Sequence, residues 1–263
     1  MLFPLMKIPN LSGWVNLVNF PPNQWEYRKK SSYFLYLLYS VGDRWETIYL
    51  DKIKFGDNLL LNTDDFKDIF SRTNLALIYP TRHHLESQLS ELPSINTWST
   101  ELPAWRASSG FKNTCTQVSY QSDLHPLPSK GSLLTFHPFI QFGELSNYLL
   151  VLNAQVNPKI ENHNLYIFNS KTKVLIDEVK IQSNRVSLIG LDKYKFKQTD
   201  LPVFICPTMA AVPFGLGISS DTKGLSLEHT HPPGSFVVRG DRNKIQKQIK
   251  SEWFKALKVE TLS

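Results

Sequence analysis

The stretch Leu216-Gly-Ile-Ser219-Ser-Asp-Thr-Lys-Gly224-Leu-Ser-Leu-Glu-His229 decides the expected fold. Two short apolar runs flank a polar turn that ends in Gly224. Glycine supplies the positive φ that tight turns between strands often need. The stretch therefore predicts a β-hairpin whose second strand carries His229 near its end.

The same pattern recurs along the chain, where short runs rich in aromatic and β-branched residues alternate with turn residues. A second hairpin is expected around Asn169-Ser-Lys-Thr172. Many short strands with turn signals between them are typical of a β-sandwich or barrel, so we expect a mainly β fold. The expected strands are 13–18, 33–39, 45–50, 58–61, 75–79, 116–120, 133–136, 148–155, 164–168, 174–181, 185–189, 203–206, 216–219 and 225–229.

A weak internal repeat links residues 65–81 with residues 192–208. Each copy is a charged, aromatic-bearing segment that leads into an apolar strand and ends in Pro-Thr, at Pro80 and at Pro207. The repeat predicts two β-sandwich lobes related by a duplication, with chance similarity between strand-rich segments as the alternative. After its Pro-Thr, the first copy continues into residues 82–92, where we expect one short helix.

The expected domains are an N-terminal β-rich lobe (1–92), a linker (93–103) rich in Pro, Ser, Thr and Asn, and a C-terminal lobe (104–263). The second lobe would end in an amphipathic helix that begins after Asp241, which can serve as its N-cap. We favour docking of the apolar stripe on the protein with the lysines in solvent. The alternative is a basic face for an anionic partner such as nucleic acid or an acidic glycan. The two faces consist of Lys244, Lys247, Ser251, Lys255 and Lys258 on one side and Ile245, Ile249, Trp253, Ala256 and Leu257 on the other.

Composition limits the class of protein. The 263 residues carry a formal charge of +6, and 41% are hydrophobic, which is typical of a packed globular chain. The longest apolar run, 33–39, is far shorter than the roughly 20 residues of a membrane-spanning helix, so we expect no membrane insertion. The absence of a secretory pattern at the N-terminus, and two cysteines without a pairing pattern, predict a cytoplasmic protein.

The strand that ends at His229 carries the strongest chemical signal. His229 and His231 are two residues apart and would project from the same face of a strand, which Pro232 then ends. Such a pair can hold a divalent metal such as zinc, but a metal site needs at least one further protein ligand. We prefer His137, at the end of another expected strand, over His125, Asp241, or the pair His83 and His84. The alternative is two packed imidazoles that close a turn.

If the metal binds, the protein would be a metal-dependent hydrolase in which a bound water is activated and a carboxylate acts as general base. Strand alternation turns Glu228 away from the histidine face unless a bulge intervenes. A third hypothesis is metal-free acid/base chemistry that uses one of the histidines with Glu228 and Arg239.

A different group of residues favours binding without catalysis. Trp105 and Arg106 are adjacent, and Tyr120 follows, so the three can form a stacking and hydrogen-bonding surface for a sugar ring or a peptide. Alternatively, Trp105 fills an interface between the lobes. We rank a non-catalytic β-sandwich binding or assembly protein first, with a glycan or protein partner, and leave open whether the chain is an enzyme. No aromatic residues alternate with the C-terminal lysines, which argues against a nucleic-acid partner.

Overall fold

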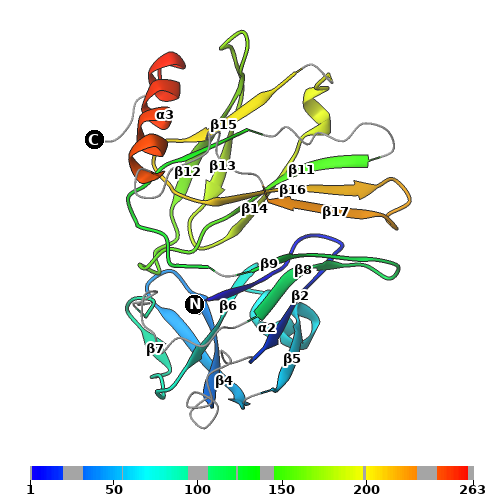
Figure 1. The fold of residues 1–263 in the computed structure, drawn as a ribbon, viewed down its shortest axis with the longest axis vertical. Coiled ribbons are helices and arrows are strands. Elements are labelled where there is room, and N and C mark those ends of the chain that lie inside the picture. Colours follow the sequence, from blue (N-terminus) through cyan, green and yellow to red (C-terminus); the bar gives the residue numbers. More distant parts are fainter. Residues whose placement is uncertain are drawn as a thin grey trace. The chain divides into compact units, whose positions relative to one another are not determined.

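The computed structural model describes residues 2–19, 32–54, 56–93, 106–122, 124–136, 145–197, 200–229 and 242–259. The described chain is mainly β, as expected (Figure 1). It forms two compact units. Unit 1 comprises 1–126, 154–160 and 184–186, and unit 2 comprises 127–153, 161–183 and 187–263.

Unit 1 contains two antiparallel sheets. The five-stranded sheet has the order β1 (Phe3–Met6), β6 (Leu75–Thr81), β3 (Tyr33–Ser40), β4 (Trp45–Ile53) and β7 (Gln88–Leu89). The four-stranded sheet has the order β5 (Asn58–Asn62), β2 (Ser12–Val18), β8 (Arg106–Lys112) and β9 (Gln117–Gln121). Two short helical turns, η1 (Thr63–Phe66) and α2 (Lys67–Phe70), lead from β5 to β6.

The core of unit 1 follows from the alternation of its strands. Side chains two apart on a strand share a face, so Leu35 and Leu37 of β3 enter one apolar cluster with Val15 and Leu17 of β2. Both sheets therefore bury their inner faces against each other. The backbones of β1 and β2 approach closely at Gly13, where a Cβ would lie 1.7 Å from the carbonyl oxygen of Met6. This position therefore requires glycine.

Two segments that are distant in sequence complete unit 1. From the segment 154–160, the Val156 carbonyl accepts hydrogen bonds from Trp45 Nε1 at 3.1 Å and from the Leu92 amide at 2.9 Å. From the segment 184–186, the Val186 amide donates to Asn74 Oδ1 at 3.0 Å, and Asn74 Nδ2 donates back to the Val186 carbonyl at 2.6 Å. Unit 1 is therefore not continuous in sequence.

Unit 2 also contains two antiparallel sheets and a helix. One sheet has the order β10 (Leu133–Phe136), β15 (Pro202–Cys206), β12 (Asn162–Asn169) and β13 (Leu175–Gln182). The other has the order β14 (Val186–Gly190), β11 (Leu145–Leu152), β16 (Val212–Ser219) and β17 (Leu225–His229). The turn η2 (Asp192–Tyr194) follows β14, and the helix α3 (Arg242–Ala256) follows β17. Inner side chains such as Val151, Ile167 and Phe204 form one cluster between the two sheets.

The two units repeat the same strand order. The sheet β1-β6-β3-β4 corresponds to β10-β15-β12-β13, and β5-β2-β8-β9 corresponds to β14-β11-β16-β17, with β7 as an addition to unit 1. In chain order the corresponding strands also follow one another in the same succession. The topology is therefore repeated, and an origin by duplication stays a prediction.

The sequence match is nevertheless out of phase by one residue. Aligning the two Pro-Thr pairs places Ile78 with Ile205. In the structure, Ile78 of β6 faces the core between the sheets, whereas Ile205 of β15 faces α3, and Cys206 takes the inner position. A one-residue shift moves a side chain to the other face of a sheet. Cys206 pairs with Leu133, the first residue of β10, as Ile78 pairs with Phe3, the first residue of β1, so we take Cys206 as the counterpart of Ile78.

Helix α3 lies on the outer face of the β10-β15-β12-β13 sheet (Figure 1). Phe254 and Leu257 are buried against Phe168 and Ile205, and the Trp253 ring meets the Phe136 ring edge-on with centroids 5.0 Å apart. Docking of the apolar side of the helix is thus confirmed for Ile249, Trp253 and Leu257, whereas Ala256 is exposed. Phe254, which was not assigned to the stripe, is buried there instead. The expected N-cap Asp241 lies outside the described residues.

Two local expectations were wrong or incomplete. Residues 82–92 do not form a helix: they contain β7, in which Leu89 pairs with Trp45 of β4. The strands β1 and β8 were not expected. β8 and β9 follow the expected linker in sequence, yet they belong to unit 1, where β8 pairs with β2 and β9 pairs with β8. The linker 93–103 itself lies outside the described residues apart from Pro93, and it stays a prediction. Within the described ranges, no helix is long and apolar enough to cross a membrane.

Candidate functional site

The histidine hairpin forms, with Thr222 and not Gly224 at the positive φ of its turn, and its chemistry stays a prediction. His229 is the last residue of β17, where it pairs with Phe214 of β16, and nothing is described of its side chain. Glu228 is exposed on the same strand. The other expected site residues, His231, His137 and Arg239, lie outside the described residues. In the part of the chain that the structure describes, no three His, Cys, Asp or Glu side chains are grouped so as to hold a metal ion.

The expected stacking surface is described only in part. Trp105 lies outside the described residues, and Arg106 is the first residue of β8, with a side chain that is not described. Tyr120 lies on β9 opposite Ser109 and is half-buried. Whether the three side chains form one surface stays a prediction.

Sequence reasoning missed an aromatic surface on the outer face of the five-stranded sheet of unit 1. We define it as Phe34 and Tyr36 of β3, Tyr49 of β4, and His84, which follows β6. The Phe34 and His84 rings have centroids 4.0 Å apart and are tilted by 35°. Tyr49 meets Tyr36 at 5.6 Å and Phe34 at 6.3 Å, both edge-on. The four rings therefore form one contiguous cluster.

A β-bulge assembles this surface. The inner face of β3 is occupied by Leu35 and Leu37, so the residues between and before them, Tyr36 and Phe34, point outward. The pairing of β3 with β4 shifts between Leu35 and Tyr36, so that Tyr36 lies opposite Tyr49 while Phe34 lies opposite Lys52. Tyr49 and Lys52 are three residues apart and would face opposite sides of a regular strand. The bulge brings both to the outer face.

The base of the aromatic surface is held in place, while its rim is open. Only 3% of the Tyr36 side chain is exposed, and its hydroxyl accepts a hydrogen bond from the Leu85 amide at 3.2 Å and bonds His84 Nδ1 at 3.1 Å. Tyr49 is 51% exposed. The Lys52 ammonium lies 5.3 Å from the centre of the Phe34 ring, within the range of a cation–π interaction. A ligand would therefore meet rings packed on a fixed Tyr36, with a charged group over Phe34.

The corresponding positions in unit 2 are polar. Strand pairing places Asn164 and Asn162 of β12 where unit 1 has Tyr36 and Phe34, and Lys180 of β13 where it has Tyr49. Lys180 Nζ donates to Asn164 Oδ1, and Gln182 Nε2 donates to Asn162 Oδ1 at 3.1 Å. The same strand arrangement thus forms with amides and ammonium groups at this place. The fold does not require the rings of unit 1.

A cluster of rings outside the apolar core, with Tyr49 and His84 exposed, indicates a contact surface. Chemically, the aromatic surface offers flat apolar faces and an imidazole that bonds the Tyr36 hydroxyl, with the Lys52 ammonium beside it. Such a set of groups is suited to recognition. Comparison with known proteins identifies no relative, since no protein-family model, no curated protein and no solved structure matches this chain.

Proposed function

We propose that this protein is a non-catalytic binding or assembly protein, and that the aromatic surface of unit 1 contacts its glycan or protein partner. The observation that carries the proposal is the exposure of Tyr49 beside three fixed rings, at positions where the repeated topology of unit 2 has polar side chains. Exposed aromatic residues in a rigid setting are the side chains that most often dominate the energy of an interface.

Of the two partner classes, a glycan fits the groups on this surface best. The apolar face of a sugar ring can stack on Tyr49, because this ring is exposed and offers a flat face at little conformational cost. The sugar hydroxyls can then bond His84 and the Lys52 ammonium at the edge. A protein partner would instead bury the same rings under an aromatic or aliphatic side chain.

Two features of the architecture support this reading as part of the proposal. In each unit the two sheets share one apolar cluster, as in a β-sandwich, and the strand order is the same in both units. We therefore infer two sandwich lobes that arose by duplication. After a duplication, only one unit would need to keep the original function. The outer sheet faces of the two units could then diverge, which would leave rings in unit 1 and amides in unit 2.

The cysteines are consistent with a binding protein in a reducing, cytoplasmic compartment. Cys115 and Cys206 are both free. Burial raises the pKa of the Cys206 thiol, which keeps it protonated and unreactive at neutral pH. Cys206 therefore acts as a core residue and offers no nucleophile.

A glycan array followed by calorimetry with the strongest sugar tests the proposal. We expect Tyr49→Ala to weaken binding about tenfold, the effect of losing one stacked ring. Phe34→Ala should also weaken binding, because Phe34 packs against both Tyr49 and His84. Leu60→Ala is the matched control, because Leu60 is an exposed apolar residue of β5 in the other sheet of unit 1, 55% exposed. Loss of binding on Tyr120→Ala with full binding by Tyr49→Ala would instead assign the contact to the surface expected from sequence.

A further inference from the structure

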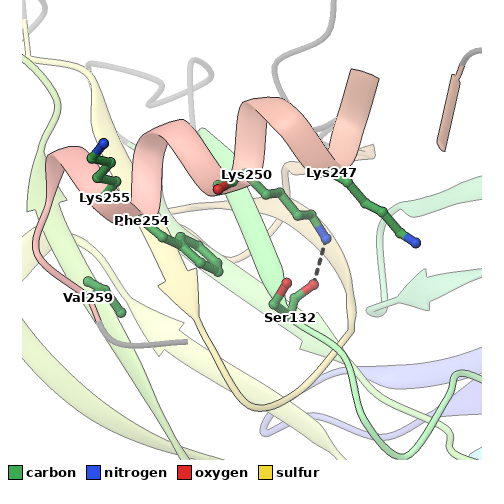
Figure 2. A pocket seen from close by; sticks show the side chains of 7 residues that line it. Ser132, Lys247, Lys250, Phe254, Lys255 and Val259 are labelled. Atoms are coloured by element: carbon green, nitrogen blue, oxygen red, sulfur yellow. Dashed lines mark hydrogen bonds between the residues drawn. The ribbon is translucent and has the colours of Figure 1, made fainter. Parts of the chain in front are cut away.

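A cavity of about 580 Å³ lies beside α3 in unit 2, and it is independent of the aromatic surface (Figure 2). Three of its lining residues are lysines of the helix, and two are serines that can donate hydrogen bonds. No acidic side chain is among the described residues that line it. The lining residues are Ser132, Lys247, Lys250, Ser251, Phe254, Lys255 and Val259.

Lys250 is the unusual member of this set. Its side chain is half-buried, and its ammonium donates a hydrogen bond of 2.7 Å to the carbonyl oxygen of Ser132, as Figure 2 shows. Burial lowers the pKa of Lys250. Among the described residues it has no carboxylate within ion-pair distance. Removing a cation from water without a counter-charge costs free energy, so an apolar residue would serve stability better at this position.

The helix period gathers further charge around this group. Lys247 precedes Lys250 by one helical turn, and Figure 2 shows both side chains extending from the same side of α3. Ser251 and Lys255 are four residues apart and line the same cavity. Ammonium groups and hydroxyls are all donors here, and a phosphate group presents several acceptor oxygens with up to two negative charges. From this arrangement we propose that the cavity binds a phosphate-bearing anion, with Lys250 at its centre.

The surroundings distinguish two sources of such a phosphate. A second cavity of about 570 Å³ shares Val259 with the first, and Lys173, Leu175 and Lys258 line it. The adjacent hairpin exposes three apolar residues in a row, Val174 (60%), Leu175 (48%) and Ile176 (38%). Exposed apolar side chains beside lysines are suited to the headgroup region of an anionic lipid layer. A soluble phosphate ester would use the lysines alone.

The test measures binding of two probes to the full chain. Glycerol 3-phosphate is titrated by calorimetry, and sedimentation is measured with phosphatidylcholine vesicles that contain or lack phosphatidic acid. We expect Lys250→Met to weaken binding of whichever probe binds by about tenfold, the effect of one lost charge-assisted hydrogen bond. Lys250→Arg should retain most of the affinity. Lys197→Gln is the matched control, because Lys197 is exposed in unit 2 and lines neither cavity.

Each outcome decides something. Binding of glycerol 3-phosphate in solution assigns a soluble phosphate ester, whereas binding confined to phosphatidic acid vesicles, reduced by Val174→Asp, assigns a lipid headgroup. Thermal unfolding shows that Lys250→Met is folded, and we expect its melting temperature to be unchanged or higher. Failure of both probes to bind, equal binding by Lys250→Met, or a lower melting temperature for that variant would overturn the proposal.

Discussion

Replacement of Phe254 by alanine tests how α3 is held on unit 2. Phe254 is only 3% exposed and packs against the outer face of the β10-β15-β12-β13 sheet. A buried phenylalanine removes roughly 150 Å² from water, which at 25 cal/mol/Å² corresponds to about 4 kcal/mol. Because the cavity beside Phe254 lets the helix settle toward the sheet, we expect a smaller loss, about 3 kcal/mol.

Amide hydrogen exchange measures how much this substitution weakens the docking of α3 itself. In Phe254→Ala the protected amides of residues 249–256 should exchange roughly a hundredfold faster, while those of β11 keep their protection. Gln248→Ala is the matched control, since Gln248 is exposed on the same helix and alanine favours helix formation. Unchanged exchange in α3 would refute the role of Phe254 in holding this helix on the sheet. An equal loss of protection in β11 would refute the expectation that α3 can open while the sheets stay folded.

Three further predictions follow from the fold and from the unsettled metal hypothesis. Gly13→Ala should prevent stable folding of unit 1, because its Cβ would lie 1.7 Å from a backbone oxygen. Gly190→Ala should be tolerated, because the nearest atom to its Cβ would be 3.7 Å away. Thermal melting followed by circular dichroism measures the stability of both variants. Burial lowers the pKa of His163, and the nearby Glu161 opposes this with a smaller effect. The folded protein should therefore lose stability as the pH drops below 6.5, the ordinary pKa of a histidine side chain. Denaturant titrations at several pH values should show that His163→Gln flattens this dependence. If the histidine hairpin holds zinc, elemental analysis should find the metal in stoichiometric amount and find none in His229→Ala, and a metal-free wild-type protein would remove the hydrolase hypothesis.

The strands were predictable wherever apolar periodicity was strong. Residues 133–136 and 225–229 were predicted with the observed bounds, because the first run is mostly apolar, the second begins with alternating leucines, and turn residues or prolines bound both. β8 was missed because its sequence, Arg106-Ala-Ser-Ser-Gly-Phe-Lys112, lacks β-branched residues and forms a strand through pairing on both sides, with β2 and β9. Local propensity carries no signal for such a strand.

Two other errors have physical causes. Leu85, Leu89 and Leu92 are spaced as on one face of a helix, but the backbone of residues 88–89 pairs with β4 instead, so tertiary pairing overrides the pattern. The phase of the repeat was misjudged because matched Pro-Thr pairs show sequence likeness and do not show which face a residue takes.

The candidate sites were beyond sequence for a different reason. The aromatic surface depends on the bulge between Leu35 and Tyr36, which no single strand reveals, and on His84, which comes from another element. Lys250 was passed over because the helix was divided into a lysine face and an apolar face, and its position lies between them. Only the docked helix shows that its ammonium turns toward Ser132.

Chemical-shift mapping during titration with the strongest sugar from the array tests the central claim most directly. The ring protons of Tyr49, Phe34 and His84 should shift together and saturate at one affinity, while the resonances of Tyr120 and of β17 stay in place. Shifts confined to β17 or to the surroundings of Tyr120, with the rings of unit 1 unmoved, would contradict the account.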